Sequence, residues 1–174
     1  VRHVVAFSSG NHAQGVARAV TTRSLKATII MPKDTPTTKI EGTKAYGADV
    51  VTYDRYTESR EEIGEALSQK YNANLIKPYD DVRVIAGQGT VGLEIARQAS
   101  LMGVVPDALI CCCGGGGLIA GTSIALHAHF SETKIWCAEP EFYDDTKRSL
   151  ETGNIERAQT DKTSICDAIV TPEP

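Results

Sequence analysis

Two short stretches of the sequence carry residues that could do chemistry. The first is "SSGNH", residues 8–12, where two hydroxyls, an amide and an imidazole directly follow an apolar run. The second is "GGGGL", residues 114–118, which follows a run of apolar residues and cysteines. Glycines carry no side chains, so their N–H groups can approach an anion closely, and a helix that starts after them adds its positive end. The second stretch therefore favours a phosphate site.

The first stretch holds more polar groups than a helix start needs. Ser9 or Asn11 alone would serve as a helix N-cap, which requires one short polar side chain. Ser8, His12 and Gln14 beside them indicate a second recognition surface. No serine and aspartate stand in triad order with His12, so a structural, hydrogen-bonded histidine is favoured over a catalytic one.

A dinucleotide site is the alternative interpretation of the glycine run. Gly115-x-Gly117-x-x-Ala120 fits the loose G-x-G-x-x-G/A pattern, and Glu139 follows Gly117 by 22 residues. Against this, the pattern normally sits in the first βα unit of its domain, and it leaves residues 8–12 without a role. A non-catalytic nucleotide- or NAD-binding module stays open as the alternative of another class.

Oxygen ligands gather in the stretch "AEPEFYDD", residues 138–145. Its carboxylates are those of Glu139, Glu141, Asp144 and Asp145. Such hard ligands can hold Mg²⁺ or Ca²⁺, although an acidic surface loop is the ordinary interpretation.

The five cysteines do not point to a disulfide framework. Their number is odd, no CxxC pair occurs, and consecutive residues of a strand alternate faces, so Cys111, Cys112 and Cys113 cannot converge on one metal. We expect reduced, buried thiols here and at Cys137 and Cys166.

Composition limits the classes of function. A chain of 174 residues with 41% hydrophobic and 23% charged residues should fold as one full or two small domains. A net charge of −4 without a run of Lys or Arg argues against nucleic acid as a partner, and no apolar stretch or signal segment predicts a membrane location. We expect a cytoplasmic protein, and the start without Met and the end at "TPEP" indicate a fragment.

The elements that would position these residues alternate between strand and helix, which is typical of a parallel α/β sheet. Polar stretches at strand ends are then expected at the carboxyl edge, where ligands bind in such sheets. Strands are predicted at residues 1–7, 27–31, 49–53, 74–76, 107–113 and 133–138. Helices are predicted at about 13–20, 37–46, 57–71, 84–102 and 118–130. The long fourth helix should bury a stripe made by Val84, Val91, Ile95, Ala99 and Met102.

Four motifs in this order resemble the fold type II pyridoxal-phosphate enzymes, specifically the serine/threonine dehydratase and serine racemase group. They are "SSGNHAQGVA", "AGQGTVGLEI", "GGGGLIAG" and "AEPEFYDD". The resemblance covers essentially the whole chain. It implies two parallel-sheet αβα sandwich domains of the tryptophan synthase beta-like kind, incomplete at both ends. With the boundary at the "PYDD" loop, residues 1–80 would be a small substrate-gripping domain and residues 81–174 part of the large cofactor domain.

The resemblance also implies site residues. The phosphate of pyridoxal 5′-phosphate would be held by Gly114, Gly115, Gly116, Gly117 and the Leu118 amide. Asn11 would bond the 3′-oxygen of the cofactor ring. The substrate carboxylate would be gripped by Ser8, Ser9, Gly10, Asn11 and His12. Ser9 matches the acid/base of the racemase branch, where many threonine dehydratases have alanine.

A metal site is implied by the same resemblance. Glu139, Asp145 and the carbonyl of Tyr143 match the racemase-type ligands of Mg²⁺, Mn²⁺ or Ca²⁺, which takes Glu139 away from a ribose role. The family's Schiff-base lysine and its pyridine-nitrogen partner have no match, so we expect the chain alone to be inactive. Pro78-Tyr79 stands where racemases often have Pro-Asn, which favours a dehydratase.

The implied reaction is deamination of L-threonine or L-serine, with loss of water, to 2-oxobutyrate or pyruvate and ammonia. In it the cofactor acts as electron sink, and its phosphate protonates the leaving hydroxyl. Serine racemase, alone or together with dehydratase activity, is the alternative. We expect a small amino-acid substrate and a homodimer or homotetramer. Threonine, serine and hydroxyaspartate stay open as substrates, as does any nucleotide effector.

Overall fold

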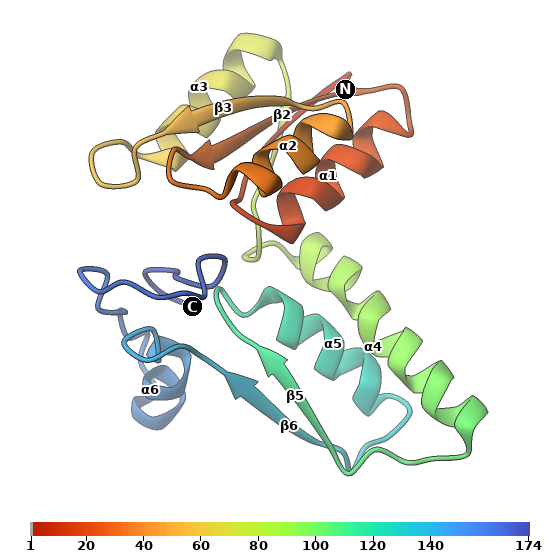
Figure 1. Ribbon diagram of the computed structural model, residues 1–174. Coiled ribbons are helices and arrows are strands. Elements are labelled where there is room, and N and C mark those ends of the chain that lie inside the picture. Colours follow the sequence, from red (N-terminus) through yellow and green to blue (C-terminus); the bar gives the residue numbers. More distant parts are fainter. Residues whose placement is uncertain (1) are drawn as a thin grey trace. The chain divides into compact units, whose positions relative to one another are not determined.

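The computed structural model describes residues 2–174 (Figure 1). The chain divides into two compact units, Val1–Pro78 and Tyr79–Pro174. The observed boundary lies two residues before the expected end of the first domain at residue 80. The roles assigned to the two domains stay predictions.

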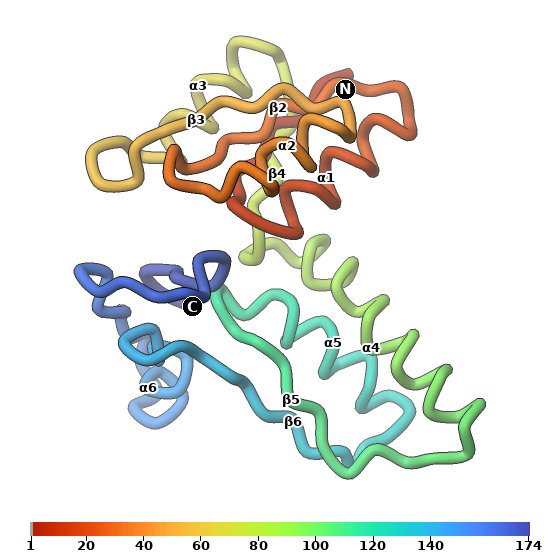
Figure 2. Tube along the Cα trace, viewed as in Figure 1, coloured from red at the N-terminus to blue at the C-terminus, as the bar shows by residue number. Residues whose placement is uncertain are grey.

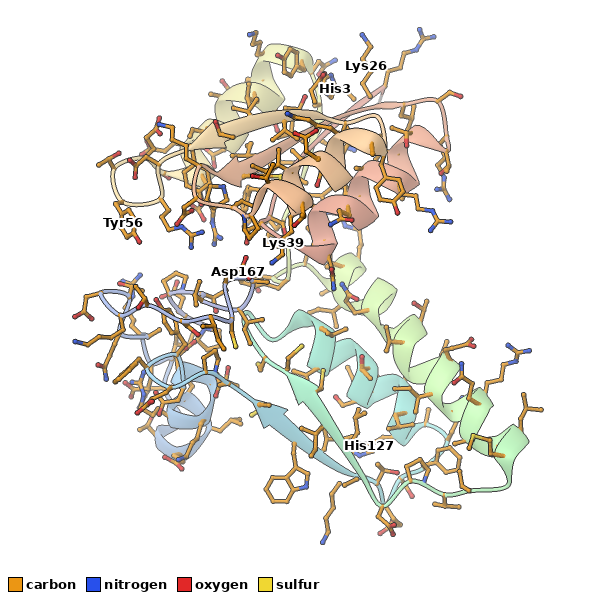
Figure 3. All side chains as sticks on the ribbon, viewed as in Figure 1. His3, Lys26, Lys39, Tyr56, His127 and Asp167 are labelled. Atoms are coloured by element: carbon orange, nitrogen blue, oxygen red, sulfur yellow. The ribbon has the colours of Figure 1, made fainter. Side chains whose placement is uncertain are left out.

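The first unit is a four-stranded parallel sheet with the strand order β3-β2-β1-β4 (Figure 2). Its first two strands start at His3 and Lys26, which are register partners and are labelled in Figure 3. The strands are β1 (His3–Phe7), β2 (Lys26–Pro32), β3 (Asp49–Tyr53) and β4 (Asn74–Ile76). The helices are α1 (Asn11–Thr21), α2 (Thr37–Ala45) and α3 (Arg60–Tyr71).

Helices cover both faces of this sheet, as its continuous apolar strands require. On one face the strand side chains pack with α1, whose residues Ala13, Ala17 and Val20 are buried, as the helical spacing predicts. On the other face Val5, Phe7, Ile30 and Tyr53 are buried, and partly buried apolar residues of α3 pack against them. The first unit therefore has a closed core that fixes the carboxyl end of β1.

The second unit is built around the parallel pair β5–β6, in which Cys111 is the register partner of Cys137. Exposure alternates along both strands, so one face of the pair, with Ile110 and Trp136, is exposed. The elements are α4 (Val82–Met102), β5 (Ala108–Cys112), α5 (Gly117–His127), β6 (Lys134–Ala138) and α6 (Asp145–Thr152).

Helices α4 and α5 pack against each other at glycines, so the predicted apolar stripe of α4 is wrong at Val91 and Met102 but right at Ala99. Val91 and Met102 are exposed at 42% and 73%, whereas Gly89, Gly92, Ala96 and Ala99 are buried. A Cβ on Gly92 would overlap the Thr122 carbonyl. The two backbones approach closely because this face carries almost no side chains.

The predicted fold class is confirmed, and all six predicted strands are present with ends within two residues; Val1 lies outside the described residues. Helix α3 starts at Arg60 instead of residue 57 because the Ser59 hydroxyl caps it, accepting from Glu62 N at 3.2 Å. Helix α6 was not predicted. Within residues 2–174 no helix has both the length and the apolar character needed to cross a bilayer.

Candidate functional site

Residues 8–12 form the turn between β1 and α1. Ser8 N donates to Ile30 O at 3.1 Å, and the Ser8 hydroxyl accepts from Gly10 N at 3.2 Å, so the turn is tied to the sheet. The N-cap of α1 is Gly10, and no side chain caps the helix. Ser9 and Asn11 are therefore not used as caps, and the N–H groups of the first turn can bind an anion such as a carboxylate.

The ring of His12 lies in this turn, and its Nε2 is buried without a hydrogen-bond partner. The prediction of a hydrogen-bonded structural histidine is therefore wrong at this atom. Burial lowers the pKa of His12, so the ring is neutral at pH 7. A buried ring nitrogen without a partner at a helix N-terminus fits a ligand that supplies the missing partner.

The glycine run forms the turn between β5 and α5, and a side chain would fit badly along it. A Cβ on Gly114 would lie 3.2 Å from the Cα of Ile169, and one on Gly117 would lie 2.8 Å from the Tyr79 carbonyl oxygen. Gly116 is the N-cap of α5 in the left-handed region, with φ 78°, and has open space beside it. No side chain caps α5. The amides that start α5 thus form a cradle that fits a phosphate.

The thiols before this cradle differ in exposure. Cys113 is 1% exposed, and its sulfur lies 3.3 Å from the Thr146 hydroxyl oxygen. Burial raises the pKa of Cys113 and raises the pKa of Cys111 to about 11. Cys112 is exposed, so the prediction of buried thiols is wrong there. Cys166 is also exposed, so the prediction is wrong there too. Cys111 and Cys137 are half-buried. All five cysteines are free thiols.

The acidic loop leads from β6 into α6. The Glu139 carboxylate accepts from Thr146 N and from Lys147 N, both at 2.9 Å, and so caps α6. Asp145 is 1% exposed, its Oδ2 has no hydrogen-bond partner, and burial raises the pKa of its carboxyl group. A buried carboxylate oxygen without a partner fits a cation ligand. Within residues 2–174 no group of three His, Cys, Asp or Glu side chains forms a metal cluster.

The two histidines of the second unit, His127 and His129, differ in their surroundings. The His127 ring, labelled in Figure 3, donates through Nε2 to Thr133 O at 2.7 Å and so ties the end of α5 to the start of β6. His129 is exposed. His129 lies two residues past the end of α5 at His127, so the two histidines do not share a helix.

Each half of the predicted site is assembled locally. The structure brings Gly114–Leu118 together in one turn, and Glu139, Tyr143 and Asp145 in one loop and helix start. Residues 8–12 belong to the other unit, and their position opposite the glycine run stays a prediction. Sequence reasoning missed Thr146, Ile169 and the contact of Tyr79 with the glycines.

Together, parallel α/β units and a glycine turn that opens a helix define a protein of the parallel α/β class with a candidate phosphate site. The family model described as "Pyridoxal-phosphate dependent enzyme" matches residues 1–174, and the chain belongs to this family. Its fold is that of the fold type II enzymes, as the four sequence motifs predict.

Relatives of known activity are ammonia-lyases and racemases. The chain is 44% identical to the L-threo-3-hydroxyaspartate ammonia-lyase of Pseudomonas sp over 92% of its own length and 49% of the relative. It is 39% identical to the serine racemase of Schizosaccharomyces pombe, over 92% and 48%. The crystal structure of the T.th. threonine deaminase superimposes with a TM-score of 0.89 at 45% identity, over 99% of this chain and 55% of that one. The chain spans about half the length of the curated relatives it matches.

Proposed function

We propose that the protein acts as a pyridoxal-phosphate-dependent ammonia-lyase on a β-hydroxy amino acid. L-threonine or L-serine loses water, from the Cα proton and the β-hydroxyl, and then ammonia by hydrolysis, which gives 2-oxobutyrate or pyruvate. The observation that carries the proposal is the uncapped glycine turn at the start of α5, within a chain that belongs to this family. The likeness to a threonine deaminase structure at 45% identity supports the lyase reaction.

The residues of this chain bind and orient in the proposed reaction. The amides of Gly114–Leu118 hold the cofactor phosphate, and Asn11 donates from its side chain to the ring oxygen. The N–H groups at the start of α1, with Ser8 and Ser9, bind the substrate carboxylate at the positive end of the helix. When bound, the cofactor supplies an electron sink for the charge left at Cα.

Racemisation of serine is the second candidate. Ser9 favours it, because its hydroxyl stands in the substrate turn without serving as the cap of α1. Relatives at 39% and 38% identity are serine racemases. In this reaction Ser9 exchanges a proton with Cα on the face opposite the family's lysine.

The family to which the chain belongs does not favour the dinucleotide alternative. Each oxygen of Glu139 accepts from one backbone amide of α6 and keeps a further lone pair for a ligand. We propose instead that Asp145, the carbonyl of Tyr143 and a remaining lone pair of Glu139 hold Mg²⁺, Mn²⁺ or Ca²⁺. A homodimer or homotetramer and a cytoplasmic location belong to the same proposal.

The test uses the complete gene product that contains these 174 residues. It is incubated with L-threonine, L-serine and L-threo-3-hydroxyaspartate, and the 2-oxo acid and ammonia are measured together with D-serine by chiral chromatography. We expect 2-oxo acid and ammonia in equal amounts, with threonine or serine preferred. The variant Ser9→Ala should abolish D-serine formation while elimination is less affected. A protein that binds pyridoxal phosphate but releases no 2-oxo acid from any of the three would contradict the lyase assignment.

The same gene product also tests the expected inactivity of this chain by itself. If the Schiff-base lysine lies outside residues 1–174, the chain expressed alone should bind the cofactor without a covalent link. Borohydride reduction should then leave no cofactor attached to the isolated chain, whereas the complete protein retains it.

A further inference from the structure

Tyr79 lies directly against the glycine turn, and both belong to the second unit. A Cβ on Gly115 would overlap the Tyr79 ring at Cγ, Cδ1 and Cδ2. A Cβ on Gly117 would lie 2.9 Å from the Cα and 3.0 Å from the Cβ of Tyr79. Glycine is therefore required at both positions by Tyr79 itself, independently of any ligand.

Tyr79 lies between two restricted segments of the chain. Pro78 precedes it and has its own φ fixed by its ring. Two residues later Asp81 caps α4 by accepting from Arg83 N at 2.8 Å. The Arg83 guanidinium also binds both oxygens of Asp81, at 3.0 and 2.7 Å. These bonds fix the start of α4 two residues after Tyr79.

The sides of the turn differ in what covers them. Gly115 is covered by the Tyr79 ring, Gly117 by the Tyr79 backbone and Gly114 by Ile169. Among these four glycines, Gly116 alone would have no atom within 4 Å of a Cβ added to it. Other parts of the second unit thus surround the turn except at Gly116. Four consecutive glycines would otherwise be very flexible, and these contacts restrict them.

We propose that Tyr79 is a positioning residue for the phosphate-binding turn. Its ring presses on Gly115 and its backbone on Gly117, so the amides of Gly116 to Leu118 keep one arrangement before the ligand arrives. Such preorganisation increases affinity because less conformational entropy is lost on binding. This inference rests on the proposed function only in taking the ligand of the turn to be a phosphate group.

The test measures the Kd of pyridoxal 5′-phosphate by absorbance titration and the Kd of inorganic phosphate by competition, in the complete gene product. Tyr79→Ala should weaken both by about tenfold, which corresponds to the loss of one well-placed charged hydrogen bond. Tyr79→Phe keeps the ring and is the matched control, with both Kd values within about twofold of the wild type. The urea midpoint of each variant checks that it is folded.

Gly115→Ala keeps the inference testable if Tyr79→Ala does not fold. Its new methyl group displaces the ring, so Gly115→Ala should weaken phosphate binding as Tyr79→Ala does. The double variant should then be no weaker than the weaker single variant, because both changes break one contact. Unchanged Kd values in Tyr79→Ala, or losses that multiply in the double variant, would overturn the inference. Normal phosphate binding without 2-oxo acid formation would overturn the lyase assignment alone.

Discussion

At the scale of single residues, two buried polar atoms without partners lie in the candidate sites of the two units. Such an atom costs about 1–3 kcal/mol unless something binds it. His12 Nε2 and Asp145 Oδ2 are two of these atoms, and each lies at a helix N-terminus that a polar stretch of the sequence had marked. The hydroxyls of Thr35, Ser68 and Thr122 are also without partners, so burial alone does not distinguish a site. Thr35 also directly precedes the N-cap of α2, so what distinguishes His12 and Asp145 is that each lies in a polar stretch singled out in the sequence.

His12 should make stability depend on pH. Burial lowers its pKa in the folded chain below the ordinary 6.5. The unfolded chain therefore takes up the proton first, and the free energy of unfolding falls as pH drops below 6.5, by up to about 1.4 kcal/mol per pH unit until the folded ring also titrates. Urea unfolding between about pH 7.5 and 5 measures this slope. His12→Gln should remove that part of the slope, whereas His129→Gln, at an exposed position, should leave it.

Asp145 should link cation binding to stability. In EDTA the variant Asp145→Asn should be at least as stable as the wild type, because it removes a buried charge whose Oδ2 atom has no hydrogen-bond partner. In Mg²⁺ the order should reverse, since a cation at a hundred times its Kd adds about 2.7 kcal/mol to the wild type only. Thermal unfolding in the two buffers measures both effects. Glu141→Gln, in the same loop but exposed, is the control. Equal Mg²⁺ stabilisation of Asp145→Asn and wild type would disprove this metal site.

At the scale of elements, glycines decide how α4 and α5 pack. A Cβ on Gly121 would overlap the Ile85 carbonyl and lie 2.7 Å from Gly89 N. Since both obstacles are backbone, no side chain can move aside to make room. The motif "AGQGTVGLEI" is therefore explained in part by helix packing, independently of the cofactor.

Gly121→Ala should destabilise the second unit by about 1–3 kcal/mol, because the helices must separate to admit the methyl group. Gly87→Ala is the matched control on an exposed face of α4, where no atom lies within 4 Å of the new Cβ. It should stabilise by about 0.5–1 kcal/mol through higher helix propensity. Urea unfolding measures both. A Gly121→Ala variant as stable as Gly87→Ala would show that the crossing tolerates a side chain.

The same elements show what the sequence could predict. Periodicity located α4 and the buried Ala99 but wrongly included Val91 and Met102, which follow helical spacing, because most of the packing face is made of residues too small to register as hydrophobic. Helix α6 was missed since Leu150, its one large apolar side chain, is 76% exposed and leaves no stripe. The glycine cradle could be predicted because four consecutive glycines have few other uses. Its contacts with Tyr79 and Ile169 could not, since they join residues far apart in sequence.

At the scale of the whole molecule, the two units differ in how completely helices cover the faces of their sheets. The first buries Val5, Ile29, Ile30 and Met31 completely between helices on both sheet faces. The second leaves one face of β5–β6 exposed, with Ile110 at 74%. Because buried apolar area is the main stabilising term, we expect the first unit to be the more stable.

The single tryptophan makes this difference measurable in the 174-residue chain. Trp136 lies on β6 of the second unit and is partly covered there, so its fluorescence reports the unfolding of that unit. In urea its emission should change at a lower midpoint than the amide exchange of Val5, Ile29 and Ile30, whose slow exchange reports the first unit. Trp136→Phe should leave the amide-exchange midpoint of the first unit unchanged, which checks that the tryptophan side chain itself does not alter the stability of that unit. Coincident midpoints for both probes would mean that the two units unfold as one cooperative body, against the separate cores described above.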